Sequence, residues 1–242
     1  MADVEDVFDM LDGESKPFES NEKKDDKKFD YYGNPDVKPI KPDPSKFKKP
    51  GKTFMVAINN YNTTIPKDTV DEIVKIAKAL FSKGWKFRHN GSEDDLIQNA
   101  ILEIEDANVE SYIPWKKFNT KIKNPYLTKA TPDAYHIASA GFGKFFKERS
   151  NGLRSIFAMA VNTMLGEDCK SPVGLVIAWN EDGAEVLDNK PNYKTLGNLA
   201  FYLRICEWSN IPVFNVKNED AVSRIVKTLK SKEEESKGLL DG

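Results

Sequence analysis

Cysteine and long apolar runs are the two things this sequence has least of. Only Cys169 and Cys206 occur in 242 residues, and their separation matches no metal-ligand spacing. We therefore expect reduced thiols in a cytosolic chain, without a disulfide framework or a metal site. No apolar run is long enough to span a membrane, and no signal-peptide stretch opens the chain. This predicts a protein that is neither membrane-embedded nor secreted by the usual route.

A surplus of basic residues is absent as well. The chain carries 36 Lys and Arg against 38 Asp and Glu, which leaves a formal net charge of -2. Without a global positive field, the composition does not favour nucleic acid or an anionic membrane as a partner. One stretch is locally basic with an aromatic residue, as a single-strand nucleic-acid site would require, although a solvated loop explains it equally well. Its members are Lys116, Lys117, Lys121, Lys123 and Tyr126.

Histidine is scarce, with only His89 and His136 in the chain. Either imidazole could serve as an acid or a base near neutral pH, but a hydrogen-bonded structural histidine is the commoner case. We therefore predict no catalytic residue and no cofactor. The sequence favours a protein that is not an enzyme, and an enzyme stays among the alternatives below.

Aliphatic residues are sparse in the first fifty positions. Residues 1–14 are acidic with apolar side chains at helical spacing, and residues 15–50 mix both charges with repeated prolines. We predict a tail over 1–51 whose removal leaves the melting temperature unchanged, and a second tail over 231–242. The first tail is either a docking segment for a protein partner or a solubilising leader. The candidate docking residues are Val4, Val7, Phe8, Leu11, Tyr31 and Tyr32.

Residues 52–230 carry the pattern of a folded domain. Apolar runs predict strands at about 53–60, 85–88, 109–115, 173–179 and 211–216, and the intervening stretches have helical periodicity. Strands that alternate with helices indicate an α/β fold, because parallel strands need helical crossovers on the faces of the sheet. The prediction is a three-layer Rossmann-like sandwich with a largely parallel sheet of about five or more strands.

Polar residues follow the predicted strands at the positions where a parallel sheet binds ligands. Because the carboxyl ends of parallel strands share one edge, Asn59 and Asn60, His89 to Ser92, and Thr195 to Asn198 should converge on one cleft. A strand-to-helix junction such as His89 to Asp95 also favours an anion, although a simple helix cap by Ser92 accounts for the same residues. The candidate ligand-binding residues are Asn59, Asn60, His89, Asn90, Gly91, Ser92, Asp95, Trp115, Thr195, Gly197 and Asn198.

Several separate segments over about residues 52–230 resemble one superfamily, in the same order and at similar spacing. They are YIPWKKFN, the lone His136, the helix ending MLG, VIAWNEDG and TLGNLAFYLRICEWSNIPVFNV. The chain resembles the Rossmann-like nucleotide-binding (SLOG) superfamily that includes DNA-processing protein A and the lysine-decarboxylase-like phosphoribohydrolases. It is most similar to the small DprA-like proteins of phages and bacteria. The resemblance implies a cytoplasmic protein, or one found in the host cytoplasm or virion if a phage encodes it.

The glycine-rich turns of that superfamily are largely replaced in this chain. Relatives carry glycine turns after the first two strands, an Arg-Asn pair before Leu-Gly, and Gly-Gly-Thr before the last helix of the terminal βαβ unit. Here those places read INNY, HNGSEDD, MAVNTMLG and NYKTLGN. A Cβ keeps backbone N–H groups from approaching a phosphate closely, so these losses indicate a degenerate or altered pocket.

Three functions from different classes follow from the sequence. The first is a non-catalytic binding or assembly module with a partner-docking tail. The second is a sensor or sponge for a nucleotide-derived small molecule, in which asparagine, serine and threonine side chains replace the glycine contacts. The third is a nucleotide N-glycosidase or a single-strand DNA recombination mediator. Fold alone does not choose among them, and an oligomer is compatible with each.

Overall fold

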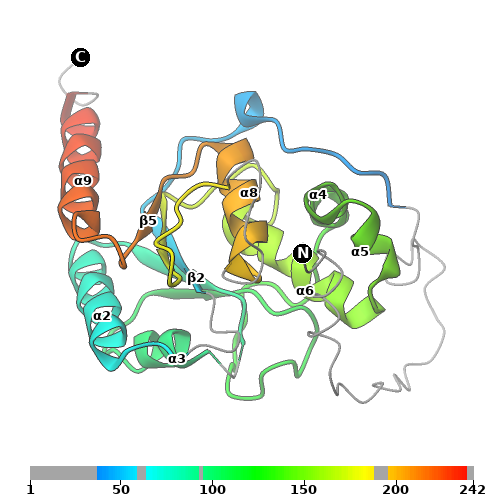
Figure 1. Cartoon of the computed structure of the whole chain (residues 1–242), viewed down its shortest axis with the longest axis horizontal. Helices are drawn as coiled ribbons and strands as arrows, with labels where there is room; N and C mark the ends of the chain where they lie inside the picture. The colour runs from blue at the N-terminus through cyan, green and yellow to red at the C-terminus, as the bar shows by residue number, and fades with distance from the viewer. Residues whose placement is uncertain (1–36, 59–63, 93–94, 188–195, 239–242) are drawn as a thin grey trace.

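The central sheet contains five parallel strands. A computed structural model describes residues 37–58, 64–92, 95–187 and 196–238. The strands run in the order β3-β2-β1-β4-β5 (Figure 1). Their bounds are β1 Thr53–Ile58, β2 Lys86–His89, β3 Val109–Ser111, β4 Leu175–Trp179 and β5 Val213–Asn215. This confirms the predicted α/β fold with a parallel sheet.

The chain adds strands to the sheet in one direction from β1 to β3 and in the opposite direction from β4 to β5, so the switch point lies between β1 and β4. β2 and β3 lie on one side of β1, whereas β4 and β5 lie on the other. The register of the central pair runs from Phe54 beside Leu175 to Ile58 beside Trp179. Every residue of both strands is buried, as their unbroken apolar runs predict. Ligands of open α/β sheets bind at the carboxyl ends of the strands at such a switch point.

Helices cover both faces of the sheet, and the strands alternate between two apolar cores. On one side Phe54, Val56 and Ile58 pack against α2 (Lys67–Ser82), α3 (Leu96–Leu102) and α9 (Ala221–Gly238). On the other side Met55 and Ala57 pack with α4 (Pro132–Phe142), α6 (Asn151–Leu165) and α8 (Leu199–Ser209), and the short α5 (Lys144–Glu148) follows α4. Figure 1 shows these two helical layers on opposite sides of the sheet.

Both edges of the sheet are occupied by the chain itself. At the β3 edge, Tyr112 forms an isolated parallel bridge with Leu127, and the Ile113 N–H donates to the Leu127 carbonyl at 2.9 Å. At the β5 edge, the Asn215 N–H donates to Glu185 Oε1 at 2.8 Å. The long segment after β3 thus folds back and pairs with the residues that follow this strand.

The C-terminal helix continues beyond its predicted end. We predicted a helix to residue 230 followed by a tail over 231–242, but α9 extends to Gly238. The sequence SKEEESKG is rich in Lys and Glu, which are good helix formers, so propensity extends the helix where no apolar pattern marks it.

The first domain boundary also lies earlier than predicted. We placed residues 37–51 in the tail, yet they form an extended strap along α4, with a short 3-10 helix, η1 (Pro44–Lys46), near its middle (Figure 1). Val37 is 3% exposed and belongs to the core cluster under α4. The Ile40 N–H donates to the His136 carbonyl, and Ser139 Oγ donates to the Val37 carbonyl. One buried aliphatic residue in a polar stretch gives no periodicity, which is why the sequence did not predict these contacts.

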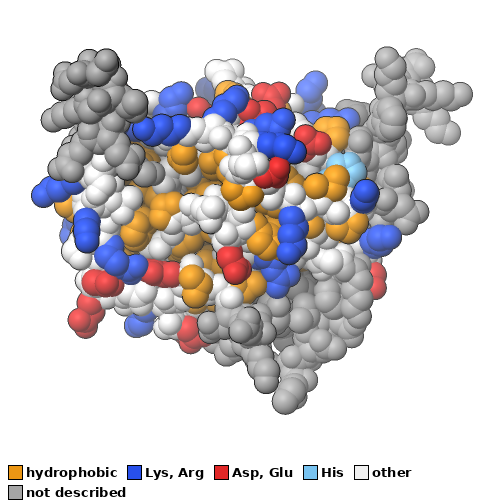
Figure 2. All heavy atoms as spheres, turned by 90° about the horizontal axis from the view of Figure 1, so that it is seen from above, with side chains coloured by type: hydrophobic (Ala, Val, Ile, Leu, Met, Phe, Trp, Pro, Cys, Tyr) orange, Lys and Arg blue, Asp and Glu red, His pale blue; other side chains and the backbone are white. Residues whose placement is uncertain are grey.

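The strap continues over α8 and the loop before β4. The Lys41 ammonium lies 4.9 Å from the centre of the Trp208 ring, and Lys48 Nζ lies 2.7 Å from Asp168 Oδ2. Figure 2 views the molecule from above and shows hydrophobic side chains gathered in the middle of this face, with Lys and Arg side chains around them. Removing the whole of residues 1–50 should therefore destabilise the domain, contrary to the expectation from sequence.

Replacing Val37 with alanine should lower the free energy of unfolding by roughly 1–2 kcal/mol, because two buried carbon atoms leave the core. Urea unfolding followed by circular dichroism measures this loss. Lys38, the exposed neighbour in the same strap, provides the matched control, and its replacement with alanine should change stability by less than about 0.5 kcal/mol. Equal effects of the two substitutions would show that Val37 does not anchor the strap.

Candidate functional site

Asn180 occupies the switch point, directly after the last residue of β4. Its side chain is fully buried. Its Oδ1 accepts hydrogen bonds from the Ala184 N–H at 2.9 Å and from Asn215 Nδ2 at 2.7 Å. Both partners are donors, so the orientation of the amide is fixed and Nδ2 faces the other way. That nitrogen has no acceptor among the described residues. A buried donor without a partner destabilises the fold, and such a group points to a ligand or a water that completes it.

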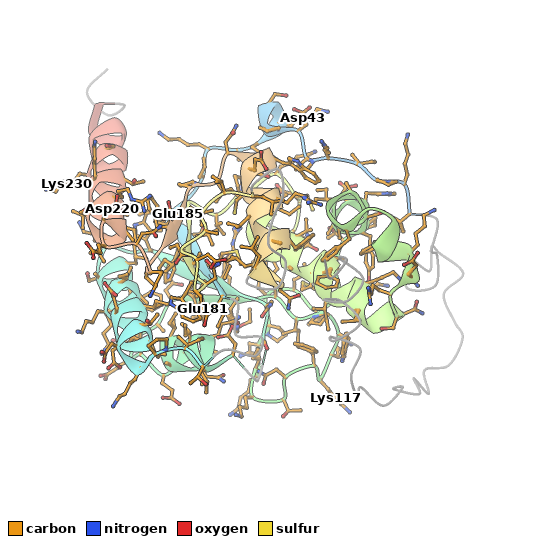
Figure 3. The ribbon with its side chains drawn as sticks, viewed as in Figure 1. Asp43, Lys117, Glu181, Glu185, Asp220 and Lys230 are labelled. Atoms are coloured by element: carbon orange, nitrogen blue, oxygen red, sulfur yellow. The ribbon has the colours of Figure 1, made fainter. Side chains whose placement is uncertain are left out.

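A polar clamp holds the loop that follows Asn180. Arg224 of α9 makes a bidentate ion pair with Glu185, with both N–O distances 2.6 Å. The Glu185 carboxylate also accepts hydrogen bonds from the Asn215 N–H and from Asn218 Nδ2. Burial opposes the charge of Glu185, but these hydrogen bonds and the Arg224 charge prevail and lower its pKa. Figure 3 shows Glu185 and Asp220 close together beside α9. The first half of the β4-to-α8 connection is thereby rigid, and residues 188–195 lie outside the described residues.

The N-terminus of α8 lacks a side-chain cap. Asn198 at the cap position is exposed and has helical backbone angles, and its side chain accepts no hydrogen bond from the helix. Gly197 before it is buried and has a φ of +48°. Two of the first N–H groups of α8 are paired with the preceding turn, Ala200 with the Gly197 carbonyl and Phe201 with the Asn198 carbonyl. The helix dipole still makes this end favourable for an anion. Thr195, predicted beside them, lies outside the described residues.

His89 ends β2 as a buried, neutral imidazole. The Gly91 N–H donates to His89 Nδ1 at 3.2 Å, so Nδ1 is the acceptor and the proton sits on Nε2, which lies 2.6 Å from Ser111 Oγ. The ring also stacks on Phe87 at 5.5 Å. Burial lowers the pKa of His89 to about 4, and a hydrogen bond with Gln98 opposes this shift only in part. His89 therefore ties β2 to β3, and it is poorly suited to take up a proton near neutral pH.

A polar network joins the loop after β2 to α8. Asn90 Nδ2 donates to the Tyr202 hydroxyl at 3.3 Å, and Gln98 Nε2 donates to Asn90 Oδ1 at 3.2 Å and to Asp95 Oδ2 at 2.7 Å. Burial raises the pKa of Asp95, although hydrogen bonds with Gln98 oppose the rise. Burial likewise raises the pKa of Tyr202 to about 12, against the hydrogen bond from Asn90. Since Tyr202 lies one turn after Asn198, the loop of β2 and the start of α8 lie side by side, as we predicted.

One predicted role in the β2 loop is different in the structure. Ser92 does not cap α3; Asp95 does, by accepting the Gln98 N–H at 2.9 Å. The Ser92 N–H instead donates to Asn90 Oδ1, which closes the turn. Gly91 has a φ of +75°, and a Cβ there would lie 2.5 Å from the Ile113 side chain. The glycine thus permits close packing of the segment after β3, which is a structural reason for its presence.

Trp115 makes other contacts, and the remaining predicted residues are not among the described ones. Trp115 is half-buried and packs edge-to-face on Phe118 at 4.9 Å. Its ring also approaches Gly152 of α6. Asn59 and Asn60 lie outside the described residues, as do Val4, Val7, Phe8, Leu11, Tyr31 and Tyr32.

Two residues of the site, Gln98 and Tyr202, were not predicted. Asn180 opens the loop over residues 180–195, which the strand-loop-helix pattern marks as the first place to look for a site. A signal for Asn180 was present, because asparagine stands at the end of both apolar runs 175–179 and 213–215. Two amides on neighbouring parallel strands can pair across the sheet, as Asn180 and Asn215 do. Gln98 and Tyr202 lie within amphipathic helices and carry no such signal.

A cavity of about 190 Å³ lies elsewhere, between the strap, α4 and the loop before β4. Its lining includes Asp43, Phe47, His136 and Lys170. This position is at the amino end of β4, whereas α/β sheets bind ligands at the carboxyl ends. His136 there donates from Nδ1 to the Lys38 carbonyl at 2.8 Å, which is a structural role in holding the strap.

Searches of protein-family models, of curated proteins and of solved structures find no match to this chain. Within residues 37–58, 64–92, 95–187 and 196–238, no cluster of three or more His, Cys, Asp or Glu side chains could hold a metal ion. No helix in the same residues is both long and apolar enough to cross a membrane.

Proposed function

We propose that this chain is a non-catalytic binding domain of the Rossmann-like type that holds a nucleotide-derived anion at the carboxyl edge of its sheet, between β1 and β4. The observation that carries this proposal is the buried Nδ2 of Asn180, which lacks an acceptor among the described residues at the switch point. A phosphate or carbonyl oxygen of a ligand would supply that acceptor.

Two features at the carboxyl ends of the strands support an anionic ligand. The N-terminus of α8 has no side-chain cap and presents the positive end of the helix dipole. The segment after β3, at the same edge of the sheet, carries five lysines and no acidic residue between residues 112 and 131. Asparagine and backbone donors would then serve in place of the glycine turns of the superfamily that the sequence resembles.

Binding is favoured over catalysis by the state of the titratable groups at this edge. The hydrogen bond from the Gly91 N–H keeps His89 in one neutral tautomer. The Asp95 carboxylate is occupied by the Gln98 N–H and side-chain amide. Neither group is left to activate water, which argues against the N-glycosidase alternative. Docking of a protein partner through residues 1–36 stays a prediction, because those residues lie outside the described ones.

Replacing Asn180 with aspartate tests the proposal with a nearly isosteric change. The retained oxygen still accepts from Ala184 and Asn215, while the unpartnered donor becomes an acceptor that repels anions. We expect nucleoside mono- and diphosphates to raise the melting temperature of the wild type, since a ligand at one hundred times its Kd adds about 2.7 kcal/mol. The shift should vanish in the Asn180→Asp variant.

The matched control is Asn108→Asp, an exposed asparagine before β3 at the opposite edge of the sheet. It should keep the full ligand-induced shift. Circular dichroism and the ligand-free melting temperature report whether Asn180→Asp still folds, and Asn180→Ser provides a smaller, uncharged second variant. A nucleotide shift that persists in both Asn180 variants would contradict the proposed site.

A further inference from the structure

The segment between β3 and α4, residues 112–131, is a structured basic surface that we call the lysine loop. It is the green trace below α6 in Figure 1. Asn119 fixes its base by donating from Nδ2 to the Gly91 carbonyl at 3.0 Å and accepting the Lys121 N–H at 2.9 Å. Ile122 closes a second turn by donating its N–H to the Asn119 carbonyl. The lysines of the loop are therefore carried on a fixed scaffold.

Exposed cations and an exposed aromatic ring share this loop. Lys116, Lys117, Lys121 and Lys123 are exposed, and no acidic side chain of the described residues forms an ion pair with them. Figure 3 shows Lys117 at the outer end of the loop, far from Glu185 and Asp220. Tyr126 is 55% exposed, and its ring lies 5.2 Å from that of Tyr112. The surface thus combines concentrated positive charge with an apolar contact.

One segment of the chain complements this surface in both respects. Residues 1–14, MADVEDVFDMLDGE, contain six Asp and Glu and no Lys or Arg, whereas residues 112–131 contain five Lys and no Asp or Glu. The apolar side chains of the segment recur at helical spacing, and such a face is unstable alone at this length. Against a basic surface with the exposed ring of Tyr126, the same segment would gain both charge pairing and apolar burial.

The connecting chain is long enough to bring the two together. Residues 15–36 supply 22 linking residues, which span about 25 Å as a flexible coil. The strap fixes Val37 next to Ser139 of α4, and α4 begins at Pro132 where the lysine loop ends. Seven residues of helix separate Ser139 from Pro132, or about 10 Å. A tether of this kind gives an effective concentration of about 1 mM, so even a weak contact is populated.

We propose that the acidic segment, residues 1–14, docks on the lysine loop of its own chain through charge pairing and apolar contact with the exposed ring of Tyr126. The segment then covers the basic rim beside the carboxyl edge of the sheet and is itself withheld from other partners. This inference shares the lysine loop with the proposed nucleotide site but does not depend on Asn180, so the two proposals can fail separately.

A nitroxide label on the lysine loop of the full chain tests the contact. The variant Lys123→Cys accepts the label selectively, because Cys169 and Cys206 are buried and burial raises the pKa of both thiols. We expect the amide NMR signals of residues 3–12 to lose about half of their intensity, since a Kd near the effective concentration leaves half of the chains docked. The signals should recover in about 1 M salt, where the Debye length is about 3 Å.

Three comparisons make the result decisive. A label at Lys75→Cys, an exposed lysine on α2, should leave residues 3–12 unaffected. The double substitution Asp6→Lys with Asp9→Lys should abolish the effect of the Lys123→Cys label. Mixing labelled chains with isotope-enriched unlabelled chains should give no broadening, and broadening in that mixture would mean that a second copy is the occupant and would overturn the proposal. Full signal intensity with the loop label at low salt would also overturn it.

Discussion

Replacement of Glu110 with alanine is expected to lower the free energy of unfolding by about 3–5 kcal/mol, because it leaves the buried charge of Arg88 without its partner. Glu110 Oε2 lies 2.8 Å from Arg88 Nε, and the two side chains are only 14% and 10% exposed. Arg88 also donates to the Ser171 carbonyl and lies over the Tyr112 ring, so it cannot turn outward to water without breaking these contacts. Burial opposes the charge of Glu110, but the Arg88 hydrogen bond and charge prevail and lower its pKa.

The same carboxylate provides a matched control. Lys86 Nζ lies 3.2 Å from Glu110 Oε1, but the Lys86 side chain is 46% exposed. Its replacement with alanine should change the unfolding free energy by less than about 1 kcal/mol, as for other exposed ion pairs. Replacing Arg88 with methionine and Glu110 with leucine together should recover most of the loss, since the unpaired charge is then gone. A large loss in the double variant would show that packing, and not the buried charge, dominates.

Acidification from pH 7.5 to 4 is expected to remove roughly 3 kcal/mol of stability through His89 alone. The folded-state pKa of His89 is about 4, below the ordinary value of 6.5. Between these two values the unfolded chain binds a proton that the folded chain does not bind. Stability from this residue is therefore fully present above pH 6.5 and is lost as the pH falls towards 4.

Urea unfolding of the wild type and of a His89→Asn variant across this pH range measures the contribution. The asparagine oxygen can still accept the Gly91 N–H, so the variant retains that turn and lacks only the titrating ring. The difference in stability between the two proteins should shrink as the pH falls. Comparing them also removes the effect of Asp95, whose raised pKa acts in the opposite direction. Parallel pH profiles would mean that His89 is protonated as readily in the fold as in water.

The fold was predictable because its strands are buried on both faces. The apolar runs around Phe54 and Leu175 are continuous, and the intervening helices have a clear apolar period. The strap was not predictable, because Val37 and Phe47 are single apolar residues in a polar stretch and become buried only through α4. The extension of α9 was missed for a related reason, since helix propensity acts there without an apolar face.

The candidate site was predicted in outline and not in its contacts. Parallel topology places the loop after β2 at the same end of the sheet as the start of α8, and a hydrogen bond joins Asn90 of this loop to Tyr202 of α8. The choice of Asp95 over Ser92 as the cap of α3 depends on where the helix begins, which sequence patterns locate only to within a few residues. The tautomer of His89 depends on the position of the Gly91 N–H, which no sequence pattern specifies.

The occupied edges of the sheet limit how this protein can associate with others. An open edge strand is a template for strand addition, and it underlies both peptide capture and edge-to-edge aggregation. Here the bridge between Tyr112 and Leu127 covers the β3 edge, and the Glu185 carboxylate takes the Asn215 N–H of β5. A second copy that paired with Tyr112 or Asn215 would first have to break these contacts. These contacts therefore disfavour, at those positions, the extension of the sheet from one molecule to the next.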